Sequence, residues 1–416
     1  MWSTGGTAIS RILNLAAMVI CARILGPREF GEVALLQSTL SMVGLYAGLN
    51  LGVTATRYVG FWRAHDVARA SRFLSLCSLA GLASAFVFAT AFFFSAPAIV
   101  RLCNLPQAHT SSFRLGSLIL LFTAFNGSQR GCLFGLGGFR VAAALDATAS
   151  ATTPLLMFVL ARGWGLWGAV LALVCGAALS LLLTVCGVAV VCRRQAIPTG
   201  FRGCYAEAPT LLRFGLPTFM SGALHAPSVW LGAVLLSRQA DGLAQMGFYN
   251  GAERWKSLIL FWSSCLGGVQ LSLLSNSARL GQEKAFGAIS RLVESSNVLC
   301  TAVPALGVAM ASPWLMAAYG ASFRSSWPLV VIAAASTVPL AMNSSIGQQL
   351  FAQERAWTRF LCDCVVAITT VALSLLLVPA YRARGLAATN LIAAVVGAVA
   401  VWTRPGRMSA SLERAK

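Results

Sequence analysis

The chain has 416 residues, of which 57% are hydrophobic and only 10% charged, and its mean hydropathy is +0.75. Because a soluble domain usually carries about a quarter charged residues, this composition excludes a cytosolic enzyme, a disordered chain and a secreted disulfide scaffold. The net charge of +19 does not indicate nucleic-acid binding, since the cations lie mostly in short segments between apolar stretches.

Apolar stretches long enough to cross a hydrocarbon core of about 30 Å recur along the whole chain. The first six are predicted at about 8–25, 33–56, 73–95, 115–137, 141–161 and 166–191, and six more follow a polar break, at about 214–236, 246–274, 295–317, 327–350, 361–379 and 386–403. The sequence therefore predicts an all-α, polytopic integral membrane protein with about 12 transmembrane helices.

The two halves of the chain carry similar features at a nearly constant offset. Gly31 and Gly247 each open an apolar stretch after an Arg-containing turn, and the pair Gly165-Leu166 matches Gly385-Leu386. This pattern predicts two six-helix bundles related by a parallel repeat, with a substrate site between the halves as in other repeat transporters. The expected parts are an N-terminal lobe at 1–195, a cytoplasmic linker at 196–213, and a C-terminal lobe with a short basic tail at 214–416.

The distribution of Lys and Arg predicts the orientation in the membrane. With a cytoplasmic N-terminus, 17 of the 31 cations fall in cytoplasmic segments and nine in outer segments. The positive-inside rule then favours two cytoplasmic termini.

The twelve cysteines do not indicate a metal site. They show no C-x-x-C pair, and only three histidines are available to join them. Most lie in apolar stretches and are expected to pack as small apolar residues. We expect no cofactor.

Four motifs resemble those of a known transporter family. They are Ala22–Gly31 (ARILGPREFG), Gly48–Gly60 (GLNLGVTATRYVG), Gly163–Ala172 (GWGLWGAVLA) and Gly247–Arg254 (GFYNGAER). In order and spacing they are similar to bacterial polysaccharide flippases of the multidrug/oligosaccharidyl-lipid/polysaccharide exporter superfamily.

The resemblance implies two six-helix bundles around a central cavity in the bacterial inner membrane. It implies a flippase, not an enzyme, that moves a polyprenyl-diphosphate-linked oligosaccharide from the cytoplasmic to the outer leaflet by alternating access. The product would serve surface polysaccharide assembly, such as lipopolysaccharide or exopolysaccharide, with a polysaccharide polymerase and other assembly proteins as possible partners.

An anionic diphosphate needs cations along its path, and charged groups inside a membrane usually mark such paths. Five cations lie in predicted helices or at their edges: Arg11, Arg57, Arg130, Arg254 and Lys256. Arg254, which matches the Arg of the family's Ala-acidic-Arg pattern, is expected about 12 Å deep. Arg11 alternatively extends to the headgroups, and Arg57 alternatively anchors the helix end beside Trp62.

The carboxylates near these cations have two interpretations, an internal ion pair or a contribution to the substrate cavity. Glu253 and Lys256 are three residues apart on one helix face, so they either pair with each other or contribute to the cavity. Arg130 and Asp146, on helices joined by a short turn, form either a structural ion pair or a substrate contact, and such a carboxylate can also couple to protons. Asp363 is expected to pair with Arg359, four residues earlier.

Two other classes of protein remain open. Another secondary transporter is possible, for instance a drug or cation antiporter of the same superfamily, although intramembrane carboxylates are few. A major-facilitator protein lacks support, because Phe61–Arg72 does not contain the Gly-x-x-x-Asp-Arg-x-Gly pattern. A membrane polysaccharide polymerase or ligase would need a long external loop with catalytic groups, and no nucleophile–base set is present.

Overall fold

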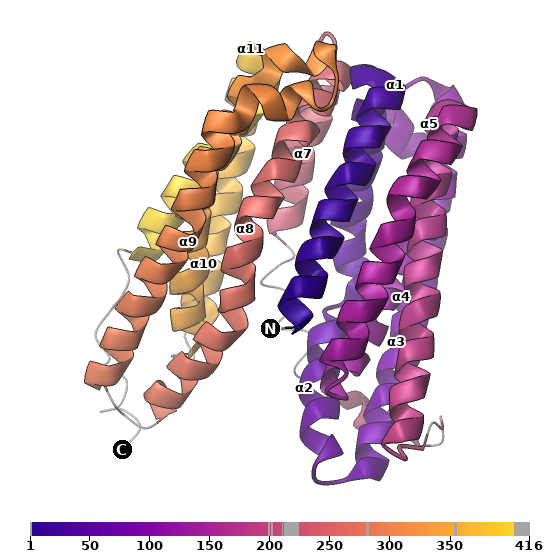
Figure 1. Cartoon of the computed structure of the whole chain (residues 1–416), viewed down its shortest axis with the longest axis vertical. Helices are drawn as coiled ribbons and strands as arrows, with labels where there is room; N and C mark the ends of the chain where they lie inside the picture. Colours follow the sequence, from indigo (N-terminus) through magenta and orange to yellow (C-terminus); the bar gives the residue numbers. More distant parts are fainter. Residues whose placement is uncertain are drawn as a thin grey trace. The chain divides into compact units, whose positions relative to one another are not determined.

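The computed structural model describes residues 2–198, 200, 203–209, 211, 224–279, 283–352 and 356–402. Within these ranges the chain is helical and contains no β-strand, which confirms the predicted all-α class. The chain divides into two compact units, unit 1 from Met1 to Gly247 and unit 2 from Phe248 to Lys416 (Figure 1).

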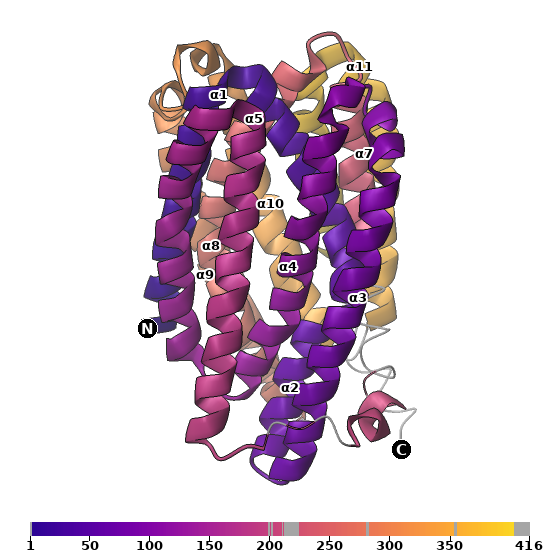
Figure 2. The same ribbon diagram turned by 90° about the vertical axis from the view of Figure 1, so that its right-hand side faces the viewer.

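Unit 1 contains the helices of the first half of the chain. In order they are α1 (Trp2–Gly48), α2 (Leu51–Arg63), α3 (Val67–Leu102), η1 (Gln107–His109), α4 (Thr110–Gly135), α5 (Phe139–Arg194), η2 (Cys204–Glu207), α7 (His225–Ser237) and the first turns of α8 (Gly242–Arg279). Helices α1, α3, α4 and α5 run alongside one another, and α2 lies at one end of them (Figure 2).

Unit 2 contains the rest of α8 and the helices that follow it. They are α9 (Glu283–Ala317), η3 (Ala321–Ser326), α10 (Trp327–Ala352) and α11 (Ala356–Trp402). Helix α10 packs against both α9 and α11 and so forms the centre of this unit. The predicted tail beyond residue 402 lies outside the described residues.

Three of the long helices are pairs of spans joined at a kink. Non-helical residues occur at Gly26 in α1, at Trp164 and Gly165 in α5, and at Arg382 in α11. At the first kink, Gly26 has a φ of 73°, which glycine adopts without a Cβ clash, and Pro27 starts the next segment where no N–H is needed. With each pair counted as two spans, and α2 counted with the second half of α1, the helices of the described residues correspond to the predicted twelve. Six helical runs of the described chain are long and apolar enough to cross a membrane.

The prediction of one continuous helix over 33–56 is wrong. The chain turns at Leu49 and Asn50, whose φ angles are 45° and 53°, and the helix restarts as α2 at Leu51. Two successive residues in the left-handed region break the helical hydrogen bonds, and asparagine tolerates this region better than most residues. The predicted start of the seventh helix at 214 lies outside the described residues.

One buried apolar cluster of unit 1 lies where α2, α3, α4 and the end of α5 meet. Buried Val59, Phe73, Leu133 and Val191 belong to this cluster. Small residues bring two of the helices very close together, since a Cβ built on Gly131 of α4 would collide with the backbone of Gly52 in α2. Such close contacts between small residues are a usual way of packing helices in membranes.

The described part of the predicted 196–213 linker packs against unit 1. Glu207 of η2 forms an ion pair with Arg69 of α3 at 2.9 Å, and the Ser75 hydroxyl donates to the Gly200 carbonyl at 2.9 Å. Cys204 and Leu211 are buried in the core cluster described above. The segment is therefore anchored on α3, while the boundaries at 195 and 214 stay a prediction.

Candidate functional site

In unit 1, Arg130 of α4 and Asp146 of α5 are brought together. The Arg130 Nη2 lies 2.6 Å from the Asp146 Oδ2, and their side chains are 36% and 13% exposed. The guanidinium also lies over the Phe134 ring, 5.8 Å from its centroid. The two residues thus form the ion pair that the sequence suggested, with the arginine as its more open member.

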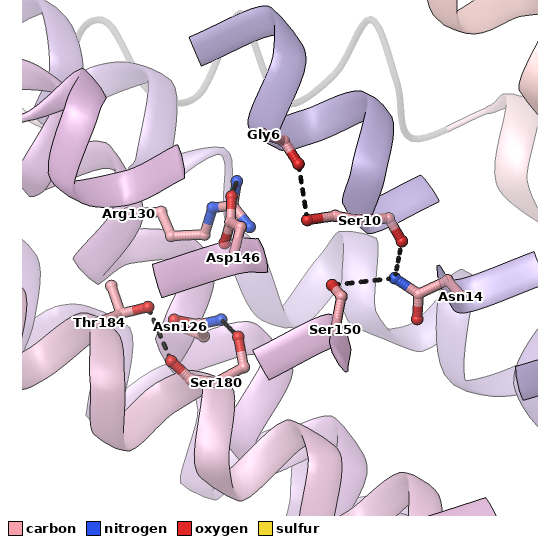
Figure 3. Close-up of polar contacts among 9 residues, drawn as sticks. All are labelled: Gly6, Ser10, Asn14, Asn126, Arg130, Asp146, Ser150, Ser180 and Thr184. Atoms are coloured by element: carbon pink, nitrogen blue, oxygen red, sulfur yellow. Dashed lines mark hydrogen bonds and ion pairs between the residues drawn. The ribbon is translucent and has the colours of Figure 1, made fainter. Parts of the chain in front are cut away.

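Polar side chains from three helices gather around this pair (Figure 3). The Asn14 amide of α1 donates to the Ser150 hydroxyl of α5 at 3.3 Å. The Asn126 amide of α4 donates to the Ser180 hydroxyl in the second half of α5 at 3.0 Å. Unit 1 therefore contains a polar region formed by amides, hydroxyls and one ion pair.

The residues of this polar region share a spacing that the sequence analysis missed. Each of α1, α4 and the two halves of α5 contributes two residues that are four positions apart, and this spacing places both on one face of the helix. The pairs are Ser10 with Asn14, Asn126 with Arg130, Asp146 with Ser150, and Ser180 with Thr184. Polar pairs at this spacing in apolar stretches are the signal that would have found them.

In unit 2, the charged residues of α8 separate onto two faces. The Lys256 Nζ lies 2.7 Å from the Glu253 Oε2, as the spacing of three residues predicted. The half-buried Arg254 instead donates from its Nε to the Asn250 Oδ1 at 3.2 Å. Arg254 is therefore held by a neutral amide one turn earlier, away from the Glu253–Lys256 pair.

A contact between distant segments positions this part of α8. The Asn390 amide of α11 donates to the Tyr249 hydroxyl at 2.6 Å, and the Tyr249 side chain is buried. Tyr249 also interacts with Glu253, one turn later on the same helix. A chain of polar contacts thus connects α11 to the Glu253–Lys256 pair, and the sequence analysis did not predict a role for Asn390.

Of the remaining predicted residues, Arg11 and Arg57 lie at the surface of unit 1, whereas Arg359 and Asp363 are largely buried in unit 2. Arg11 of α1 and Arg57 of α2 are exposed, and the Arg57 guanidinium lies 5.7 Å from the centroid of the Tyr58 ring. Arg359 pairs with Asp363 at 2.8 Å, as expected, and also donates to the Asn343 side chain at 2.8 Å. In the described part of the chain, no group of three or more His, Cys, Asp or Glu is placed to hold a metal ion.

A double-mutant cycle tests the Arg130–Asp146 pair. Arg130→Ala should lower the free energy of unfolding by about 1–2 kcal/mol, because it leaves the Asp146 carboxylate mostly buried without its cation. The expected loss is smaller than for a fully buried pair, because solvent screens the partly exposed arginine. The double variant Arg130→Ala/Asp146→Ala should lose less than the sum of the two single variants. Unfolding of the purified protein, followed by helical content in denaturant, provides the measurement, and additive losses would contradict a direct pair.

The comparison with known families decides the classification. Residues 1–265 match the family described as polysaccharide biosynthesis protein (Polysacc_synt). The chain belongs to this family. The predicted membership of the polysaccharide branch of the superfamily is thereby confirmed.

Relatives of this polysaccharide biosynthesis protein include a named exporter. The EPS I polysaccharide export inner membrane protein EpsE of Ralstonia nicotianae is 23% identical over 382 residues, which cover 88% of this chain and 84% of the relative. A homologous EpsE from Ralstonia solanacearum is also 23% identical, over 384 residues.

Solved structures support the fold of this family member over nearly its whole length. The lipid II flippase MurJ in an inward closed conformation has a TM-score of 0.78 at 16% identity, covering 96% of this chain and 86% of MurJ. An inward-facing multidrug resistance MATE family transporter of the MOP superfamily has a TM-score of 0.76 at 14% identity, covering 95% and 94%. The predicted fold of a twelve-helix transporter is confirmed.

Proposed function

We propose that this chain is a flippase for a polyprenyl-diphosphate-linked oligosaccharide. Its membership of the polysaccharide biosynthesis family and its inner-membrane export relatives support a role in polysaccharide export. The flippase moves the sugar-bearing headgroup from the cytoplasmic to the outer leaflet, while the polyprenyl tail stays in lipid. Both termini lie in the cytoplasm, as the positive-inside rule favours.

The observation that carries the proposal is the placement of arginines within α4 and α8, two helices that the sequence predicts to span the membrane. Arg254 lies half-buried in α8 of unit 2, and Arg130 lies in α4 of unit 1 beside the amides and hydroxyls of the polar region. A diphosphate must lose water to enter such a helix bundle, and guanidinium groups replace that hydration with charge-assisted hydrogen bonds. We infer alternating access to a cationic cavity to which Arg254 contributes, with Arg11, Arg57 and Arg130 as further contacts.

The pairing of the carboxylates argues against a drug or cation antiporter. Such a transporter would need intramembrane carboxylates to attract a positive substrate. The three acidic residues that the sequence places inside spans are each held by an internal cation: Asp146 by Arg130, Glu253 by Lys256, and Asp363 by Arg359. Their negative charge is thus largely compensated within the protein, so these carboxylates offer little attraction to a cationic substrate.

A complementation experiment tests the proposed function. Deleting the gene in its native host should abolish the surface polysaccharide and cause lipid-linked oligosaccharide to accumulate, with its sugar exposed to the cytoplasm. Reintroducing the gene should restore both, whereas a gene for a drug antiporter of the same fold should not. Normal surface polysaccharide in the deletion strain would contradict the proposal, as would a loss of polysaccharide without accumulation of the lipid-linked precursor.

A further inference from the structure

One end of unit 1 carries a concentrated positive charge that the transport proposal does not use. Four exposed arginines, here called the arginine cluster, surround the short turn between α4 and α5: Arg63, Arg140, Arg193 and Arg194. Figure 2 shows this end of the unit, where α2 lies and α5 ends. Arg63 lies at the end of α2, Arg140 at the start of α5, and Arg193 and Arg194 at the end of α5. These positions are far apart in the sequence, so only the fold brings them together.

One contact and the course of the backbone place these arginines near the α4–α5 turn. The Arg63 guanidinium, at the end of α2, packs directly on Gly137, where a Cβ would collide with it. Arg140 is the second residue of α5 and follows the turn immediately. The Gln195 amide donates to the Leu136 carbonyl at 2.9 Å, so α5 ends beside the same turn, with Arg193 and Arg194 just before Gln195.

The positive charge of the arginine cluster is not balanced locally. In the residues that the structure describes, none of the four arginines forms an ion pair with a carboxylate. Of the nearby acids, Glu207 is held by Arg69 and Arg72, while Asp66 accepts from the Arg69 backbone N–H at 2.9 Å and so keeps its negative charge. The arginine cluster therefore presents a net positive charge to its surroundings, even with Asp66 counted.

Aromatic side chains adjoin the same turn. Phe134 and Phe139 lie on either side of it and stack with a centroid separation of 5.5 Å, and the Phe139 side chain is 51% exposed. Aromatic rings next to cations are typical of the boundary between hydrocarbon and headgroups. An occupant that satisfies both features has a negative headgroup and an acyl chain.

We propose that the arginine cluster is a binding site for an anionic phospholipid. The arginines bind its phosphate, and Phe134 and Phe139 contact the upper part of an acyl chain. The localisation of the charge around one turn favours a retained lipid over general attraction to the membrane surface. Basic pockets between helix ends are a known way of binding acidic lipid headgroups.

Native mass spectrometry of the full-length protein in detergent tests the site. The probes are phosphatidylglycerol and phosphatidylcholine with the same acyl chains. The wild-type protein should retain phosphatidylglycerol selectively. Arg140→Gln/Arg193→Gln should lower its apparent affinity for this lipid about tenfold, since each basic residue contributes a share of the attraction.

Matched variants separate a site from a general charge effect. Arg101→Gln/Arg162→Gln removes two exposed arginines from elsewhere in unit 1 and should leave retention unchanged. Arg140→Lys/Arg193→Lys keeps the charge and should preserve most of the binding. If the double Gln variant aggregates, the single variant Arg193→Gln should still weaken retention about threefold.

Four results would overturn the proposal, and three of them concern retention. These three are equal retention of both lipids by the wild-type protein, unchanged retention in both Gln variants, and equal losses in the Arg101/Arg162 control. In an additional measurement, polyprenyl diphosphate competes with bound phosphatidylglycerol, and displacement by it provides the fourth result. If it displaces phosphatidylglycerol at a much lower concentration than phosphatidylglycerol itself requires, the site belongs to the transported lipid and not to a phospholipid.

Discussion

Arg254→Ala is expected to lower export of the lipid-linked oligosaccharide at least about 30-fold while the protein still inserts. The guanidinium is held in α8 by Asn250, and in the proposed mechanism it replaces part of the hydration of the diphosphate. Loss of a hydrogen bond to a charged group costs about 2–3 kcal/mol, which corresponds to a factor of about 30–150 in an equilibrium constant. Surface polysaccharide in the complemented deletion strain, normalised to the membrane level of the variant, is the measurement.

Two further variants make the Arg254 experiment specific. Arg254→Lys keeps the charge but not the planar group of donors, so it should retain a measurable part of the activity. Arg324→Ala removes an exposed arginine from η3 in the same unit and should export normally. Normal export by Arg254→Ala at a normal membrane level would contradict the cationic path.

Gly131→Ala is expected to lower the free energy of unfolding by about 2–3 kcal/mol. A Cβ at this position would collide with the backbone of Gly52, so α2 and α4 would have to move apart. Overpacking of a close helix contact typically costs about 1–3 kcal/mol, and the buried cluster formed by the same helices would be disturbed as well. Thermal unfolding of the purified protein in detergent, followed by helical content, is the measurement.

Gly127 provides a matched control one turn earlier on α4. A Cβ there would meet nothing within 4 Å. Gly127→Ala makes the same chemical change at a helical position, where alanine is favoured over glycine by about 1 kcal/mol, so it should leave stability unchanged or raise it slightly. Equal effects of the two substitutions would show that the α2–α4 contact is not as close as described.

The sequence was sufficient for the features that depend on one segment at a time. Apolar stretches predicted the all-α membrane fold, because a span is defined by its own length and composition. Local spacing likewise predicted the pairs of Glu253 with Lys256 and of Arg359 with Asp363, since residues three or four apart share a helix face. The family motifs predicted the classification, which the match over residues 1–265 confirmed.

Features that depend on contacts between distant helices could not be predicted. The hydrogen bond of Asn14 with Ser150 joins residues 136 apart, and that of Asn390 with Tyr249 joins residues 141 apart. Each requires a particular rotation and depth of both helices, which hydropathy does not determine. The break at Leu49–Asn50 was missed for a different reason, because the flanking residues stay apolar and only the backbone conformation changes.

Transport in proteoliposomes tests the central claim most directly. The purified protein is reconstituted with a polyprenyl-diphosphate-linked oligosaccharide, and a glycosidase or lectin added outside reports the fraction of sugar headgroups in the outer leaflet over time. We predict that the protein moves headgroups between leaflets, that Arg254→Ala does so at least about 30-fold more slowly, and that a labelled phosphatidylcholine is not moved. If the accessible fraction in liposomes with the wild-type protein stays the same as in protein-free liposomes, the proposed flippase function is wrong.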